Sequence, residues 1–77
     1  MAKVVVLHGD ADELIGEFEL DHLPRVEEYI YVPSVDDPSG LRIFKVLEVN
    51  HVAEGVPGQP PFGPGPRTFL RYCEEIT

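Results

Sequence analysis

The chain has 77 residues, with 14 acidic residues against 6 Lys or Arg, and its formal net charge is −8. A chain of this length is expected to form a single domain, residues 1–77, with little stability to spare for a strained catalytic site. Between Asp10 and Asp37, ten acidic residues stand against one basic residue, Arg25. This charge disfavours direct binding of nucleic acid, which needs clustered Lys and Arg, and favours attraction to basic proteins.

Cysteine content and the first residues bear on the cellular compartment. Cys73 is the single cysteine, so an internal disulfide is impossible, whereas small secreted domains usually carry several. The apolar run Val4–Leu7 is too short for a signal peptide or a membrane span. We therefore expect a cytoplasmic protein that makes no contact with a membrane.

The first two predicted strands are joined by a short turn. Lys3–His8 is rich in β-branched residues, and Gly9–Asp12 has the composition of a turn. A second strand is predicted over about 14–21, where apolar and acidic residues alternate as in a sheet with one face in the core. Leu14, Gly16, Phe18 and Leu20 are expected to face the core, and Glu17 and Glu19 to face water.

The middle of the chain continues the same alternation. A short strand is predicted over 29–32, with Ile30 and Val32 on one face and Tyr29 and Tyr31 on the other. Asp36–Gly40 has strong turn residues. The longest predicted strand follows, over 41–53.

That strand carries an irregularity, because the step from Val46 to Val49 is three residues where period 2 requires two or four. A β-bulge near Leu47 and Glu48 would return Val49 to the face of Val46 and bend the strand. Bent strands allow a small sheet to curl towards closure.

Residues 55–66 form a loop of four Gly and five Pro, through which neither a strand nor a helix can run. This loop is interpreted either as a recognition segment with P-x-x-P spacing or as a passive connector. A last strand is predicted over 68–76. The prediction is an all-β fold, a five-stranded antiparallel sheet rolled into a small barrel, with the Pro/Gly-rich loop before the last strand. Its predicted core is Phe18, Leu20, Ile30, Phe44, Val46 and Val49.

Two segments resemble a known pattern. Leu23–Glu28 and Phe44–His51, followed by a closing strand, are similar to small uncharacterised bacterial and phage proteins that read leucine-proline-arginine-valine-glycine-glutamate and then tyrosine-x-valine-x-x-valine-x-histidine. Glu27 stands where that pattern has glycine. The resemblance implies an SH3-like β-barrel of unassigned function and brings no catalytic residue with it.

Residue types that bind metals or carry out catalysis are present but poorly spaced. His8, His22, His51 and Cys73 match no zinc-binding spacing, and no glycine loop for a phosphate is followed by a helix. Neither a metal nor a cofactor is therefore expected. Cys73 with His51 is the one pairing that suggests a nucleophile and its base, and a packed strand cysteine is the preferred interpretation.

The favoured function is a small, non-enzymatic protein-interaction module with an unspecified protein partner. Two other hypotheses stay open: an acidic phage-type inhibitor or nucleic-acid mimic that fills a basic protein groove, and a hydrolase built on Cys73 and His51. The candidate partner-binding residues are Tyr29, Tyr31 and Phe62 for the interaction module and Glu17 and Glu19 for the mimic.

Overall fold

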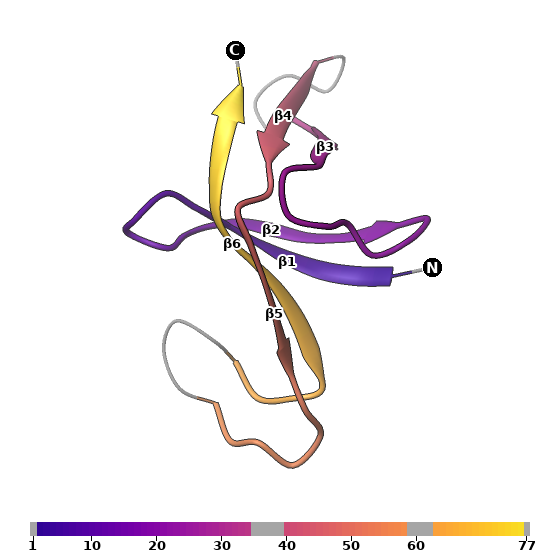
Figure 1. Ribbon diagram of the computed structural model, residues 1–77, viewed down its shortest axis with the longest axis vertical. Coiled ribbons are helices and arrows are strands. Elements are labelled where there is room, and N and C mark those ends of the chain that lie inside the picture. The colour runs from indigo at the N-terminus through magenta and orange to yellow at the C-terminus, as the bar shows by residue number, and fades with distance from the viewer. Residues whose placement is uncertain (1, 35–39, 59–62, 77) are drawn as a thin grey trace.

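The computed structural model describes residues 2–34, 40–58 and 63–76, and they form an all-β fold (Figure 1). The strands are β1 (Ala2–His8), β2 (Glu13–Leu20), β3 (Tyr29–Pro33), β4 (Leu41–Lys45), β5 (Glu48–Val52) and β6 (Arg67–Ile76). Within these residues, no helix has the length and hydropathy needed to cross a membrane.

The strands form one mixed sheet in the order β2-β1-β6-β4-β3, and β5 pairs with the first half of β6. In Figure 1, β6 runs along the molecule beside β4 and β5, and the β1–β2 hairpin crosses it. β1 and β6 are parallel, and the other pairs are antiparallel. β1 is a central strand, paired with β2 on one edge and β6 on the other. Val4, Val5, Val6 and Leu7 are all buried, so both faces of β1 are covered.

The all-β prediction is confirmed, whereas the closed, five-stranded antiparallel barrel is wrong. The described strands number six and the sheet is open, since β2 and β3 lie at its two ends and do not pair with each other. The prediction of an antiparallel sheet fails because β6 does not pair with antiparallel neighbours alone. It inserts beside β1 in a parallel register that joins Val4 with Thr68 and Val5 with Phe69.

The irregular step between Val46 and Val49 divides the long predicted strand into β4 and β5. Lys45 lies opposite Glu74, and Glu48 lies opposite Arg71. Between these pairs the backbone of Val46 bonds instead to the connector before β3, and β6 bends at Tyr72, whose φ is 57°. Val46 is fully buried and Val49 packs against the same core, so the predicted return of Val49 to that face is confirmed.

Two apolar clusters lie on opposite faces of the sheet. The main core lies on one face and contains all six predicted core residues together with six others. Its fully or nearly fully buried members are Val4, Val6, Ile30, Val32, Phe44, Val46, Leu70 and Cys73, with Ile15, Phe18, Leu20 and Val49 packed against them. The second cluster, on the outer face, contains Val5, Leu7 and Phe69, with Val52 against it.

The β1–β2 hairpin contains a register shift that changes one prediction. Val6 lies opposite Gly16, but Leu7 lies opposite Leu14, so Ile15 is an extra residue. Such a bulge reverses the facing of the residues before it. Ile15 therefore packs on the core and Leu14 is 67% exposed, which corrects the inward prediction for Leu14.

The connector before β3 is anchored to the break between β4 and β5. Glu27 N donates to Val46 O at 2.6 Å, and Val46 N donates to Glu28 O at 2.9 Å. Glu27 has a φ of 76°, in the left-handed region that favours glycine. The backbone of Glu27 therefore makes the turn that leads into β3.

The described ends of the Pro/Gly-rich loop are held together. Gly65 N donates to Val56 O at 3.1 Å, and Val56 N donates to Ala53 O at 3.3 Å. A Cβ atom at Gly65 would overlap the carbonyl oxygen of Ala53 and lie 2.9 Å from that of Val52. Only glycine allows this close approach of the two ends.

Candidate functional site

The two predicted tyrosines lie together on the outer face of β3. Ile30 and Val32 are buried, while Tyr29 is 55% exposed and Tyr31 is 63% exposed. Side chains two residues apart in a strand share a face. The predicted exposure and shared facing of Tyr29 and Tyr31 are therefore confirmed.

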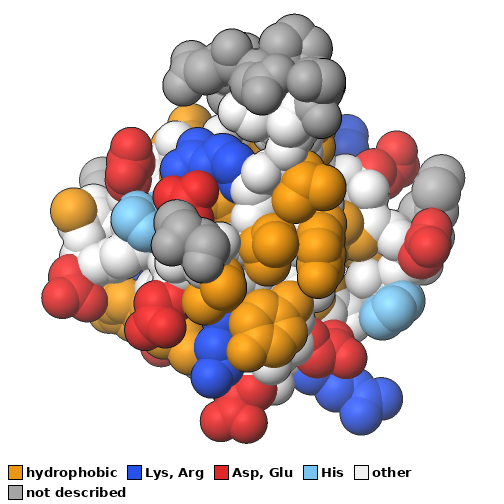
Figure 2. All heavy atoms as spheres, turned by 90° about the horizontal axis from the view of Figure 1, so that it is seen from above, with side chains coloured by type: hydrophobic (Ala, Val, Ile, Leu, Met, Phe, Trp, Pro, Cys, Tyr) orange, Lys and Arg blue, Asp and Glu red, His pale blue; other side chains and the backbone are white. Residues whose placement is uncertain are grey.

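The tyrosines belong to a larger apolar surface, here named the aromatic face. Tyr31 lies opposite Ile43, which lies opposite Ile76, and Pro33 lies opposite Leu41, which is 58% exposed. The aromatic face consists of Tyr29, Tyr31, Pro33, Leu41, Ile43 and Ile76. Figure 2 looks at the end of the molecule where β3 and β4 lie and shows hydrophobic side chains gathered at its centre with charged groups around them.

β3 is an edge strand, and its register with β4 shows which of its backbone groups form no hydrogen bond with β4. Val46 N bonds to Glu28 O, and Ser34 N bonds to Gly40 O, at the two ends of the β3–β4 ladder. In an antiparallel pair, every second residue of a strand directs its N–H and C=O groups towards the partner strand. Glu28 and Ser34 do so, and therefore Ile30 and Val32 also direct theirs towards β4. Those of Tyr29 and Tyr31 point towards the open edge.

A groove of about 590 Å³ runs along that edge, and we name it the edge groove. Its lining residues are Tyr29, Ile30, Tyr31 and Glu28 on one side and Leu20, Asp21, His22 and Pro24 on the other. It contains two carboxylates and neither Lys nor Arg. The edge groove is thus an apolar slot with an acidic rim, beside unpaired strand backbone.

A second hollow, of about 240 Å³, continues the opening at the other end of β3. Ile15, Gly16 and Phe18 of β2 line it from one side, and Pro33 and Ser34 line it from the other. We name it the β2–β3 hollow. The edge groove and this hollow together mark the opening between the two end strands of the sheet.

Glu17 and Glu19 are exposed on β2, as predicted, but basic groups lie near them. Glu19 lies directly opposite Lys3 on β1. Glu17 lines a shallow depression that also contains Lys3 and Arg67. The surface around these carboxylates has charges of both signs, and it does not form a continuous acidic strip.

The remaining predicted site residue, Phe62, lies outside the described residues. Gly63, the first described residue after it, has space for a Cβ atom 3.9 Å from the ring of Phe69. Gly63 therefore lies beside Phe69 of the second apolar cluster.

The predicted pairing of Cys73 with His51 does not form. His51 lies opposite Thr68, with its Nδ1 atom 3.3 Å from the Thr68 hydroxyl, five residues along β6 from Cys73. Cys73 is fully buried, its thiol donates to the carbonyl oxygen of Leu70, and burial raises its pKa to about 11. A neutral, inaccessible thiol without an adjacent base is a poor nucleophile.

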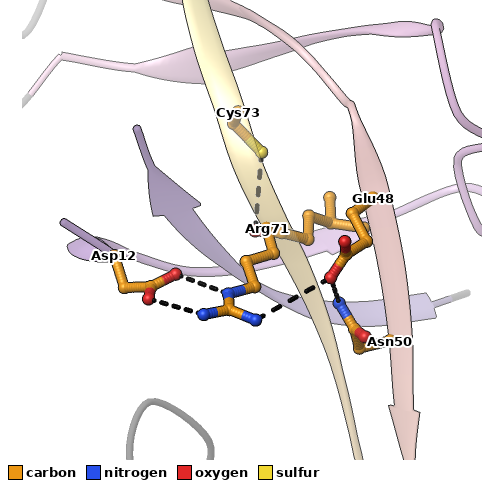
Figure 3. A network of polar contacts seen from close by, with 6 residues as sticks. Asp12, Glu48, Asn50, Arg71 and Cys73 are labelled. Carbon is orange, nitrogen blue, oxygen red and sulfur yellow. Dashed lines mark hydrogen bonds and ion pairs between the residues drawn. The ribbon is translucent and has the colours of Figure 1, made fainter. Parts of the chain in front are cut away.

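Arg71 forms a polar network that the sequence interpretation missed (Figure 3). Its Nε and Nη2 atoms donate to the two carboxylate oxygens of Asp12 at 2.8 and 3.0 Å, and its Nη1 atom lies 4.0 Å from Glu48. The hydrogen bonds from Arg71 hold the pKa of Asp12 below its ordinary value. This network ties the β1–β2 turn to the bend in β6, and 59 residues separate its two main partners, so no local pattern indicated it.

A second bidentate ion pair covers the end of the main core. Arg42 donates to both carboxylate oxygens of Glu75, at 2.8 and 2.9 Å, and lies over the ring of Phe44. These bonds lower the pKa of Glu75. Here too, sequence separation hid the pair.

Among residues 2–34, 40–58 and 63–76, no group of three His, Cys, Asp or Glu side chains is placed to hold a metal ion. Comparison with known proteins found no matching family model, no matching curated protein and no matching solved structure.

Proposed function

We propose that this chain is a protein-interaction domain that binds a partner through the aromatic face and acts by binding rather than by catalysis. One observation supports this most directly: Tyr29, Tyr31 and Leu41 are each more than half exposed on the same outward face. Contiguous apolar surface of this kind marks interaction sites on soluble proteins. Tyrosine is also enriched among the residues that dominate binding energy at interfaces.

The acidic-mimic hypothesis has weaker support. A mimic of nucleic acid needs a continuous run of negative charge to compete for a basic groove. Lys3 and Arg67 interrupt the surface that contains Glu17 and Glu19. The net charge of −8 still favours a basic partner, so charge contributes to attraction while the aromatic face supplies the contact.

Two further proposals concern lineage and compartment. We keep the resemblance to small bacterial and phage proteins as a proposal, supported by the left-handed backbone of Glu27 at the position where those sequences have glycine. A cytoplasmic location also stays a prediction, in keeping with the free thiol of Cys73.

The test is capture of partners from a native lysate at low and high salt, with two double variants. Tyr29→Thr with Tyr31→Thr removes the rings and keeps residues that suit a strand, and we expect it to weaken capture by tenfold or more. Glu17→Gln with Glu19→Gln is the matched variant on β2 and should weaken capture much less than the Thr pair. If the Gln pair and added salt abolish capture while the Thr pair does not, the mimic is favoured and the aromatic face is not the binding surface.

A further inference from the structure

We propose that the opening between β2 and β3 accepts an extended, basic segment of the partner protein, which pairs with the outer edge of β3 as an added strand. This inference rests on the proposed function and adds to it the mode of binding and the chemistry of the bound segment. Addition of a strand to an open sheet edge is a general mode of peptide recognition.

The backbone of β3 supplies the first argument. The N–H and C=O groups of Tyr29 and Tyr31 point away from β4, as the register of the β3–β4 ladder requires. Pro33 has no N–H group, so the ladder can extend along this edge only as far as its carbonyl oxygen. The edge therefore offers a short ladder centred on Tyr31.

The space beside β3 supplies the second argument. The edge groove and the β2–β3 hollow follow one another along the opening, with walls from β3 on one side and from β2 and the residues after it on the other. A strand placed there alternates its side chains between the apolar walls of these grooves and the rings of Tyr29 and Tyr31. The bound segment would thus fill the gap that leaves the sheet open.

The charged groups that line the opening indicate which kind of segment binds there. Asp21 and Glu28 line the edge groove, and its lining contains neither Lys nor Arg. Glu17 lines the β2–β3 hollow, where Arg42 is already bonded to Glu75. Lys and Arg side chains gain from such carboxylates and from the faces of exposed tyrosine rings. A second copy of this chain, with its own net charge of −8, is repelled, so we assign the opening to a basic segment.

The probe is a capped octapeptide that alternates Arg with Val, titrated into the full chain and followed by NMR. We expect the amide protons of Tyr29 and Tyr31 to gain protection from exchange, because they become hydrogen-bonded. The same peptide with Glu in place of Arg should show no binding. Added salt should weaken binding of the Arg peptide.

Two variants at one position isolate the backbone contribution. Tyr31→Ala and Tyr31→Pro both remove the ring and both leave the hydrogen bonds to β4 in place. Only Pro also removes the outward N–H group. We expect Tyr31→Pro to bind the Arg peptide about tenfold more weakly than Tyr31→Ala. If Tyr31→Pro does not fold, exchange protection in the unsubstituted chain decides.

Four results would overturn the inference. Binding of the Arg peptide without protection of the two amides means docking on the side chains alone, and equal binding of the Glu peptide means that charge does not select the segment. Protection in the free chain together with a dimer in sedimentation assigns the edge to a second copy. If the peptide does not bind but the Thr pair still abolishes partner capture, strand addition fails and the proposed function stands.

Discussion

At the scale of single residues, Glu27 adopts a conformation that its side chain disfavours. Its φ of 76° and its hydrogen bond to Val46 fix the turn that leads into β3. A residue with a Cβ atom pays for a left-handed conformation, whereas glycine loses more backbone entropy on folding. The steric cost of the left-handed conformation at Glu27 is slightly larger than the entropy that a glycine there would lose on folding.

We therefore expect Glu27→Gly to raise the free energy of unfolding by about 0.5–1 kcal/mol. Urea denaturation measures the change. Glu27→Ala removes the same charge but keeps the Cβ atom, so it should leave the stability nearly unchanged. An equal gain in both variants would assign the effect to charge, and the left-handed backbone would not be its cause.

The ion pair of Asp12 with Arg71 makes part of the stability depend on pH. The folded-state pKa of Asp12 is lowered by the hydrogen bonds from Arg71, so its contribution is complete above the pKa of the unfolded chain and disappears as pH falls through the folded-state pKa. We expect Asp12→Asn to lower the melting temperature at pH 7. Asn suits the left-handed φ of 53° at this position, so backbone strain does not contribute.

The measurement is the difference in melting temperature between the two proteins from pH 7 down to pH 3. It should be largest above about pH 5 and shrink as the pH is lowered. Asp10→Asn, in the same turn and exposed, controls for the loss of one negative charge. A difference that stays constant down to pH 3 would show that the carboxylate does not stabilise the fold through its charge.

At the scale of elements, the join between β5 and β6 depends on one glycine. A Cβ atom at Gly65 would overlap the carbonyl group of Ala53, whereas at Gly63 it would make only ordinary contacts. We expect Gly65→Ala to lower the free energy of unfolding by about 1–3 kcal/mol, as overpacking does. Gly63→Ala, in the same loop, should change it by less than about 0.5 kcal/mol.

Thermal denaturation of the two variants checks this contrast. Equal stability would mean that the described ends of the loop separate easily. The backbone bond from Gly65 to Val56 would then contribute little to the fold.

The elements show which features period 2 can predict. The alternation in β3 was enough to place Tyr29 and Tyr31 outward. The step between Val46 and Val49 indicated an irregularity at the right place, but it was predicted as a bulge inside one strand, where the structure has a break between β4 and β5. The alternation failed to predict the facing in β2, because Leu14 and Ile15 are both apolar and either could face the core. The bulge beside Gly16 therefore leaves no distinct pattern in the sequence. The matching bend at Tyr72 was also missed, although Leu70 and Cys73, three residues apart, both lie in the main core.

At the scale of the whole molecule, the pairing of residues far apart in the sequence could not be predicted from local patterns. The parallel register of β1 with β6 and the bond between Asp12 and Arg71 join residues from opposite ends of the chain. Local alternation contains no information about such partners. An antiparallel closed barrel was therefore the default expectation, and the open edge of β3 that carries the candidate site could not be predicted.

The main core spans both halves of the sheet, with Phe44 at its centre and fully buried. We expect Phe44→Ala to cost about 3–5 kcal/mol, a large part of the roughly 4–11 kcal/mol typical of a domain of this size. Leu14→Ala, at an exposed position, should change stability by less than about 0.5 kcal/mol. Chemical denaturation of both variants tests the placement, and a large effect at Leu14 with none at Phe44 would reverse it.

The parallel pairing of β1 with β6 also has a consequence for synthesis. During translation β1 leaves the ribosome before β6, so the apolar residues on both faces of β1 lack this partner until β6 has also emerged. Contacts this distant in sequence make folding slow and leave strand edges exposed to other chains. Until then, only the hairpin with β2 shields β1, and the acidic side chains of Glu17 and Glu19 oppose its association with other nascent chains.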